Sequence, residues 1–321
     1  MSITLTSTGI PETGTLSQAT SAAAMGGPAL AHGPLLVATD GAERSGVALR
    51  AAREIAARHG APVKVLTVLD PLPIVTPEIQ LPITPEMDAE RRADRLAAVR
   101  AQIARAGAAA AWTLEIDEGQ PMATIAQHAS DLAARLIVVG LGRHGMMERL
   151  FGDETALQLL RLADVPVLAV ATSFEPPPRH VVAALDFGPS SIRALRVAIE
   201  LADPHATIDL VHVVTRDMST AAWEQWQQSY SASVLEAFQD VRAEVGIPDT
   251  CAVETFLLRG DPSREILGFA DRVNADLICT GSHGHGFFSR MLLGSVATRV
   301  VRGAHCSVLG VPHPAAAHPS R

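Results

Sequence analysis

The chain has 321 residues, of which 48% are hydrophobic, and a formal net charge of -8 at pH 7. This length can bury a large core and indicates two domains. The acidic balance excludes a general nucleic-acid-binding protein, which needs a basic face to neutralise phosphates. Cys251, Cys279 and Cys306 lie singly in apolar surroundings, so they predict reduced core residues of a cytoplasmic protein and neither a disulfide framework nor a zinc site.

Residues 1–33 predict a flexible polar tail. They contain no lysine or arginine and a single acidic residue, so they lack the basic start of a signal peptide and the arginine-rich character of a transit peptide. No apolar run in the chain reaches the roughly 18 residues that span a bilayer, and we therefore expect no membrane partner. Lys64 is the only lysine, and its place in an apolar run excludes a Walker loop ending in Gly-Lys-Ser/Thr.

The rest of the chain repeats one unit. Residues 34–45, PLLVATDGAERS, have their counterpart in residues 180–191, HVVAALDFGPSS: in each an apolar run ends in an aspartate, Asp40 or Asp186, and a serine follows five residues later. Further segments match in the same order, namely 61–70 with 206–215, 117–125 with 258–266, ARLIVVG with ADLICTG, and DVPVLAV with HCSVLGV. These matches predict a first domain at 34–172, a proline-rich linker at 173–179, a second domain at 180–313 and a short tail at 314–321.

Each copy alternates short β-branched apolar runs with longer segments of helical period. This alternation predicts an α/β fold of two tandem doubly wound domains, each with a five-stranded parallel sheet covered by helices on both faces. Ligands of such folds bind beyond the carboxyl ends of the strands, where the strand order reverses, so we expect Asp186 and the loop at Gly281 to face one crevice. The short strands VPVLAV and SVLGV end the two domains, and we expect the halves to dock through them as an intramolecular pseudo-dimer.

The loop GSHGHGFFSRMLLGS, from Gly281 to Ser295, has the composition of a phosphate cradle without a lysine. Gly281 can adopt backbone angles closed to other residues, and Gly284 lets a ligand approach the main chain closely. Ser295 predicts the N-cap of a helix that stops at Gly303, with free amides and a positive dipole end directed at the crevice. The alternative is a tight strand-to-helix turn in which Ser295 is a simple cap.

Two histidines of this loop raise the question of a metal. His283 and His285 lie two residues apart, but a metal site needs a third and a fourth donor, and the loop contains no cysteine or carboxylate. We therefore predict no protein metal site here.

The spacing of Gly281, Gly284 and Gly294-Ser295 resembles the ATP-binding signature of universal stress proteins, as do the aspartate after the first strand, the GDP turn and the final HCSVLGV. The resemblance extends over both halves and implies a tandem universal stress protein with a Rossmann-like fold related to adenine nucleotide α-hydrolases. It also implies that Asp186 and the backbone around Val213 contact the adenine and ribose of ATP. The phosphates, with or without Mg²⁺, would be held by Gly281, Gly284, Gly294, Ser295 and the amide of Val296.

Two of these assignments have alternatives. Val213 also fits a core strand residue whose side chain touches no ligand. Asp186 also fits a residue that caps the turn that follows it.

The N-terminal copy departs from the signature in GLGRHGMMERLFGDE, residues 140–154. Its loop is one residue shorter, and Asp153 followed by Glu154 stands where Ser295 stands in the other half. Aspartate caps a helix as well as serine does, but two unit charges about 4 Å apart interact by roughly 4 kcal/mol at an effective dielectric near 20, which is about a thousandfold in affinity. A divalent ion bridging Asp153 to phosphate would reverse the sign. We expect one competent site, in the C-terminal half.

The sequence therefore predicts an ATP-binding regulatory protein of the stress-response type. No lysine, acidic metal pair or evident general base accompanies the cradle, so we expect no fast turnover, while slow ATP hydrolysis or phosphorylation stays open. A nucleotide α-hydrolase would need a Ser-Gly-Gly-rich loop after the first strand, which DGAERS and DFGPSS do not supply. A nucleotide-free interaction scaffold is the remaining alternative, and a homodimer is a further expected assembly.

Overall fold

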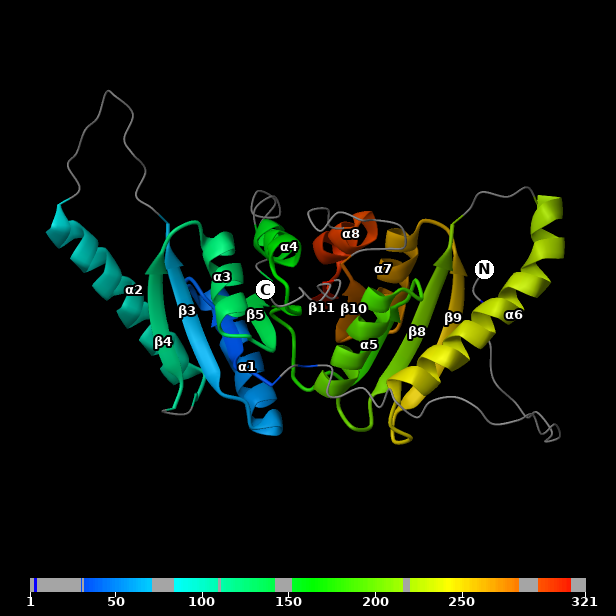
Figure 1. Cartoon of the computed structure of the whole chain (residues 1–321), viewed down its shortest axis with the longest axis horizontal. Helices are drawn as coiled ribbons and strands as arrows, with labels where there is room; N and C mark the ends of the chain where they lie inside the picture. Colours follow the sequence, from blue (N-terminus) through cyan, green and yellow to red (C-terminus); the bar gives the residue numbers. More distant parts are fainter. Residues whose placement is uncertain are drawn as a thin grey trace, which may run out of the picture.

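The computed structural model describes residues 3–4, 30, 32–70, 84–108, 111–141, 152–215, 220–282 and 294–312. Within these residues all strands form one eleven-stranded sheet in the order β1-β9-β8-β7-β10-β11-β6-β5-β2-β3-β4. Figure 1 shows the two halves of the chain side by side, with α4 and α8 in contact at the centre and α2 and α6 at the outer ends.

The N-terminal half holds five parallel strands in the order β4-β3-β2-β5-β6. Its strands are β2 (Leu35–Ala38), β3 (Val63–Leu69), β4 (Thr113–Glu118), β5 (Leu136–Gly140) and β6 (Val167–Val170). Its helices are the short 3-10 turn η1 (Glu43–Ser45), α1 (Gly46–His59), α2 (Pro85–Arg105), α3 (Pro121–Asp131) and α4 (Gly152–Leu162).

The C-terminal half repeats this topology with the order β9-β8-β7-β10-β11, again all parallel. Its strands are β7 (His180–Ala184), β8 (Thr207–Val214), β9 (Ala252–Arg259), β10 (Leu277–Gly281) and β11 (Ser307–Val311). Its helices are α5 (Pro189–Leu201), α6 (Thr220–Val245), α7 (Pro262–Arg272) and α8 (Ser295–Gly303). The predicted pair of doubly wound five-stranded domains is confirmed, and the strand order of this half reverses between β7 and β10.

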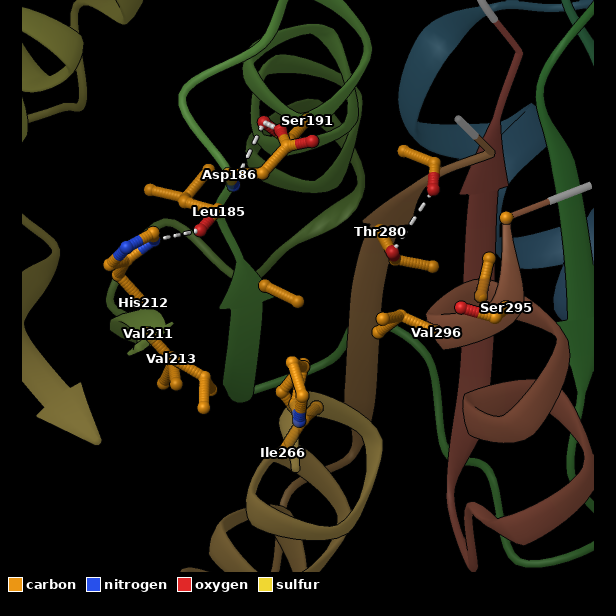
Figure 2. Close-up of a pocket in the computed structure, with 15 residues that line it drawn as sticks. Leu185, Asp186, Ser191, Val211, His212, Val213, Ile266, Thr280, Ser295 and Val296 are labelled. Carbon is orange, nitrogen blue, oxygen red and sulfur yellow. Dashed lines mark hydrogen bonds between the residues drawn. The ribbon is translucent and has the colours of Figure 1, made fainter. Parts of the chain in front are cut away.

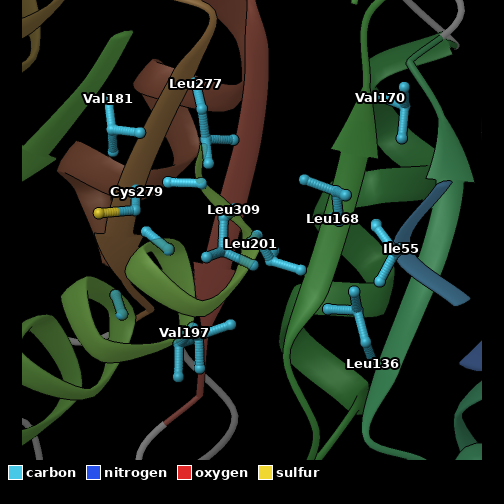
Figure 3. Packing of buried hydrophobic residues seen from close by; sticks show 14 of the residues in the cluster. Ile55, Leu136, Leu168, Val170, Val181, Val197, Leu201, Leu277, Cys279 and Leu309 are labelled. Atoms are coloured by element: carbon cyan, nitrogen blue, oxygen red, sulfur yellow. The ribbon is translucent and has the colours of Figure 1, made fainter. Parts of the chain in front are cut away.

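The two halves join through their last strands, as predicted. β6 and β11 pair antiparallel, with Leu168 opposite Leu309 and Ala169 opposite Val308. Figure 3 shows the buried side chains on either side of this junction, among them Leu168 and Leu309. One apolar cluster contains residues of α1, α2, α5 and α6, the other residues of α3, α4, α7 and α8, and both contain residues of the two halves. The junction is therefore part of a continuous core.

Parts of the predicted flexible tail are packed against the body of the protein. β1 (Ile3–Thr4) pairs antiparallel with the outer edge of β9, and Leu30 is buried, with 3% of its surface exposed. The amide of Leu30 donates to Oε2 of Glu200 at 3.2 Å. The expectation of a flexible tail is therefore wrong at these three positions, because Ile3 and Thr4 pair with a sheet edge and Leu30 packs in an apolar cluster. Within the described part of the chain no helix is both long and apolar enough to cross a membrane.

Arg58, near the end of α1, joins the two halves by hydrogen bonds to the end of α5. Its guanidinium nitrogens donate to the carbonyls of Leu201 and Ala202, at 2.8 Å and 2.7 Å. These carbonyls end α5 and lack partners within the helix. We expect Arg58→Ala to lower the free energy of unfolding by about 1 kcal/mol. The variant loses two hydrogen bonds from a charged donor, and partial exposure of these bonds to water keeps the loss small. Denaturant titration measures this, and equal loss in the exposed control Arg50→Ala on the same helix would contradict the assignment.

Candidate functional site

A cavity of about 270 Å³ opens at the carboxyl ends of β7 and β10, where the strand order reverses. The ends of three strands and the first turns of three helices, α5, α7 and α8, form its walls. Figure 2 shows Asp186 and His212 on one side of this pocket and Ser295 and Val296 on the opposite side. The lining residues are Ala184, Leu185, Asp186, Ser191, Val211, His212, Val213, Pro262, Ile266, Thr280, Gly281, Gly294, Ser295, Val296 and Ala297.

Asp186 follows β7 and its carboxylate organises the turn into α5. Oδ1 accepts hydrogen bonds from the amide of Gly188 at 2.9 Å and from the hydroxyl of Ser191 at 2.6 Å. Asp186 therefore caps the following turn, which was one of the two alternatives. Among the described residues Oδ2 accepts no hydrogen bond, and Asp186 lines the pocket. One carboxylate oxygen thus holds the backbone while the other is available to a ligand.

The side of the pocket facing α8 presents backbone amides. Gly294 is the N-cap of α8, with extended angles (φ -56, ψ 144) and no side-chain cap hydrogen bond, and its carbonyl accepts from the amide of Thr298 at 3.0 Å. The amides of the first three helical residues therefore have no carbonyl partner one turn earlier. Those residues, Ser295, Val296 and Ala297, all line the pocket. Free amides at a helix start are suited to bind an anion.

Two details of the predicted cradle are wrong. The expected N-cap, Ser295, is the first residue inside the helix and has an exposed side chain, because Gly294 occupies the cap position and its amide donates to the carbonyl of Ser282 at 2.7 Å. Gly281 does not need unusual backbone angles, since its φ lies outside the left-handed region. A Cβ at Gly281 would instead lie 2.8 Å from Cβ of Ser190 and 2.9 Å from the amide nitrogen of Ser191. Glycine is needed there because α5 packs closely against β10.

The structure brings most of the predicted site residues to this one pocket. Those that line it are Asp186, Val213, Gly281, Gly294, Ser295 and Val296. Val213 is half-buried and packs against the core as well as lining the pocket. Gly284, His283 and His285 lie outside the described residues. The two lining residues of α7, Pro262 and Ile266, were missed, although the GDP turn at the start of that helix was a usable signal.

Comparisons with known proteins identify the family of this chain. The family model described as "Universal stress protein family" matches residues 32–171 and again residues 178–312. The chain belongs to the universal stress protein family. The universal stress protein Rv2005c of Mycobacterium tuberculosis is 25% identical over 301 residues, which cover 89% of this chain and 98% of that protein. The universal stress protein MJ0531 of Methanocaldococcus jannaschii is 33% identical over 147 residues, or 42% of this chain and 83% of its own length.

A solved structure gives the same result for the fold. The crystal structure of a universal stress protein from Archaeoglobus fulgidus has a TM-score of 0.60 and 21% identity, and the match covers 88% of this chain and 97% of that one. The two matches of the family model therefore confirm the tandem universal stress protein that the resemblance implied.

His212 is a residue of this universal stress protein that the sequence analysis did not single out. Its Nδ1 is 2.7 Å from the carbonyl oxygen of Leu185, and its Nε2 is 3.0 Å from the hydroxyl of Tyr230 on α6. A carbonyl only accepts, so Nδ1 carries the proton and Nε2 accepts from the tyrosine. Burial lowers the pKa of His212, which favours this neutral form. The only signal in the sequence was a histidine within an apolar strand.

The lowered pKa of His212 predicts a pH-dependent stability. Below about pH 6.5 the unfolded chain takes up a proton before the folded chain does, so the free energy of unfolding should fall as the pH decreases from 7 towards the folded pKa. We expect His212→Gln to reduce this slope in denaturant titrations at a series of pH values. Part of the slope should remain in this variant, because burial also lowers the pKa of His59. The exposed control His205→Gln should leave the slope unchanged, and an equal reduction there would contradict the prediction.

The corresponding turn in the N-terminal half of this universal stress protein is bound by its own side chains. Asp40 accepts from Ser45 and the Ala42 amide through Oδ1, at 2.7 Å and 3.0 Å, and Oδ2 accepts from Arg44 at 3.0 Å. Both carboxylate oxygens are thus engaged, in contrast to Asp186.

A buried glutamine also forms hydrogen bonds with this turn. Gln102 of α2 accepts from the hydroxyl of Thr39 at 2.7 Å and donates to Ser45 Oγ at 3.0 Å and to the carbonyl of Ala42 at 2.5 Å. α4 begins at Gly152, which places Asp153 in its first turn. The polar groups at this strand end are therefore satisfied internally.

Proposed function

We propose that this universal stress protein binds one ATP in its C-terminal half and acts as a nucleotide-dependent regulatory protein of the stress response. The observation that carries the proposal is the start of α8, which has no side-chain cap among the described residues and opens into the same pocket as Oδ2 of Asp186, for which these residues supply no donor. The start of α8, with Ser295 and Val296, and the hydrogen-bond acceptor Asp186 stand on opposite sides of one apolar cavity, as Figure 2 shows. This is the arrangement that a nucleotide requires.

In this proposal the base, the ribose and the phosphates of ATP each contact a different part of the pocket wall. The apolar side chains of Val211, Val213, Ile266 and Val296 suit a flat base, and the identification of that base as adenine rests on the family resemblance. Oδ2 of Asp186 would accept from a ribose hydroxyl. The amides of Ser295 and Val296, at the positive end of the α8 dipole, would hold the phosphates.

Magnesium, where ATP brings it, would be held mainly by phosphate oxygens and water. Mg²⁺ commonly keeps several waters and takes few protein ligands. Within the described part of the chain no three His, Cys, Asp or Glu side chains are grouped as a metal site. We propose binding with slow or no hydrolysis, since Lys64 lies in the other half beside Glu115 and both ring nitrogens of His212 are already engaged.

Calorimetric titration of the full chain with ATP tests the proposal. We expect one ATP per chain, with GTP binding more weakly, and mass spectrometry of ligand released from gently purified protein should detect an adenine nucleotide. Absence of both signals would support a nucleotide-free scaffold instead. Single-turnover assays with radiolabelled ATP should show hydrolysis that is slow relative to ATP dissociation.

A further inference from the structure

The turn that carries Asp186 contains a strained residue. Phe187 has φ +60, in the left-handed region that bulky side chains rarely adopt. The equivalent position in the N-terminal half, directly after Asp40, is Gly41 with φ +77. The two turns therefore share one backbone shape, which glycine adopts freely and phenylalanine adopts only when its surroundings hold it there.

Aromatic contacts hold Phe187 in place. Its ring centroid lies 4.8 Å from that of His212 and 5.2 Å from that of Phe238, the latter in an edge-to-face arrangement with an interplanar angle of 73°. Phe238 lies on α6 and is fully buried, with 0% of its surface exposed. His212 in turn donates to the carbonyl of Leu185. The residues on both sides of Asp186 are thus fixed by one aromatic cluster, made of Phe187, His212, Tyr230 and Phe238.

The equivalent turn of the N-terminal half leaves little space for a side chain. A Cβ at Gly41 would lie 3.2 Å from Cβ of Ala98 and 3.3 Å from Cγ2 of Val99, both on α2. Thr67 takes the place of His212, two residues before the end of its strand. Among the described residues, the aromatic cluster therefore occurs in the half that holds the pocket and not in the other half.

We infer that Phe187 is a positioning residue, whose ring contacts hold a left-handed turn that fixes Asp186 at the pocket rim and connects the nucleotide site to α6. Phe187 is not among the residues that line the pocket, so it acts through Asp186 and not by touching the ligand. This inference rests on the proposed nucleotide binding and names the residues that set its geometry.

A double-mutant cycle on the full chain tests the inference. Phe187→Gly removes both the ring and the strain, and we expect it to weaken ATP binding about tenfold in the wild-type background. In an Asp186→Asn background the same change should weaken binding by less than about threefold, since the residue acts through that carboxylate. Equal losses in the two backgrounds, or no loss in either, would overturn the positioning role.

Thermal melts give a second readout that needs no ligand. Phe187→Ala loses the ring but keeps a Cβ in the left-handed region, so Phe187→Gly should melt at the higher temperature of the two. A higher melting temperature for Phe187→Ala would show that the left-handed turn does not strain Phe187. Phe256→Leu is the matched control, because it removes the contact with Phe269 at 4.5 Å on the other face of the same half. It should lower the melting temperature and leave ATP affinity within about twofold. A wild-type chain that binds no ATP would show that the proposed function is wrong, and the positioning role would fall with it.

Discussion

Gly281→Ala is expected to lower the free energy of unfolding by about 2 to 3 kcal/mol, because the added methyl group has no space between β10 and α5. Its Cβ would lie 2.8 Å from Cβ of Ser190, 2.9 Å from the amide nitrogen of Ser191 and 3.0 Å from the carbonyl carbon of Ser190. Two of these atoms are backbone, so relief requires moving the start of α5. ATP affinity should fall as well, since that movement displaces Asp186. Denaturant titration and calorimetry measure the two effects.

Two other glycines provide a graded control. Gly140→Ala introduces a methyl group 3.2 Å from Cα of Ser45, and it should cost less than Gly281→Ala. Gly268→Ala lies within α7, where the added methyl group would lie 3.7 Å from Nη1 of Arg272, and it should stabilise the helix by up to about 1 kcal/mol. If Gly281→Ala proved as stable as Gly268→Ala, the close approach of α5 would not be the reason for glycine at this position.

The sequence was sufficient to predict what depends on periodicity. Alternating apolar runs and helical segments located the five strands of each half, and the two unpaired final strands located the β6 and β11 junction. The position of the site followed as well, because the carboxyl ends of parallel strands meet at one edge of a sheet. These features are local or are repeated in both copies, so a single chain reveals them.

Features that depend on contacts between distant elements could not be predicted. Glycine at 281 has two physical explanations, and only the position of α5 decides between them. Gly294 and Ser295 are both good N-caps, so the helix start was misplaced by one residue. The cluster around His212 joins β8 to α6, and nothing in the spacing of the sequence links His212 to Phe187 or Tyr230.

Ser295→Asp is expected to weaken ATP binding about a thousandfold while leaving the protein as stable as the wild type. Ser295 is the first residue of α8 and its side chain is exposed. An aspartate there interacts favourably with the helix dipole, so folding should not suffer. The same carboxylate placed about 4 Å from a phosphate opposes it by roughly 4 kcal/mol at an effective dielectric near 20. Calorimetry without divalent metal measures the loss. Ser295→Ala, which removes the hydroxyl without adding charge, should cost less than about tenfold because the amides remain.

The reciprocal change in the N-terminal half should not create a second site. Asp153→Ser removes the acid from the first turn of α4, yet Arg44 still engages Asp40 and Gln102 still bonds to Thr39 at the end of β2. Titration of this variant should again give one ATP per chain. Two ATP per chain would show that the charge of Asp153 alone had closed the N-terminal half. Binding by that half in the wild type only when magnesium is present would instead identify Asp153 as a metal ligand, because a bridging cation reverses the sign of its interaction with phosphate.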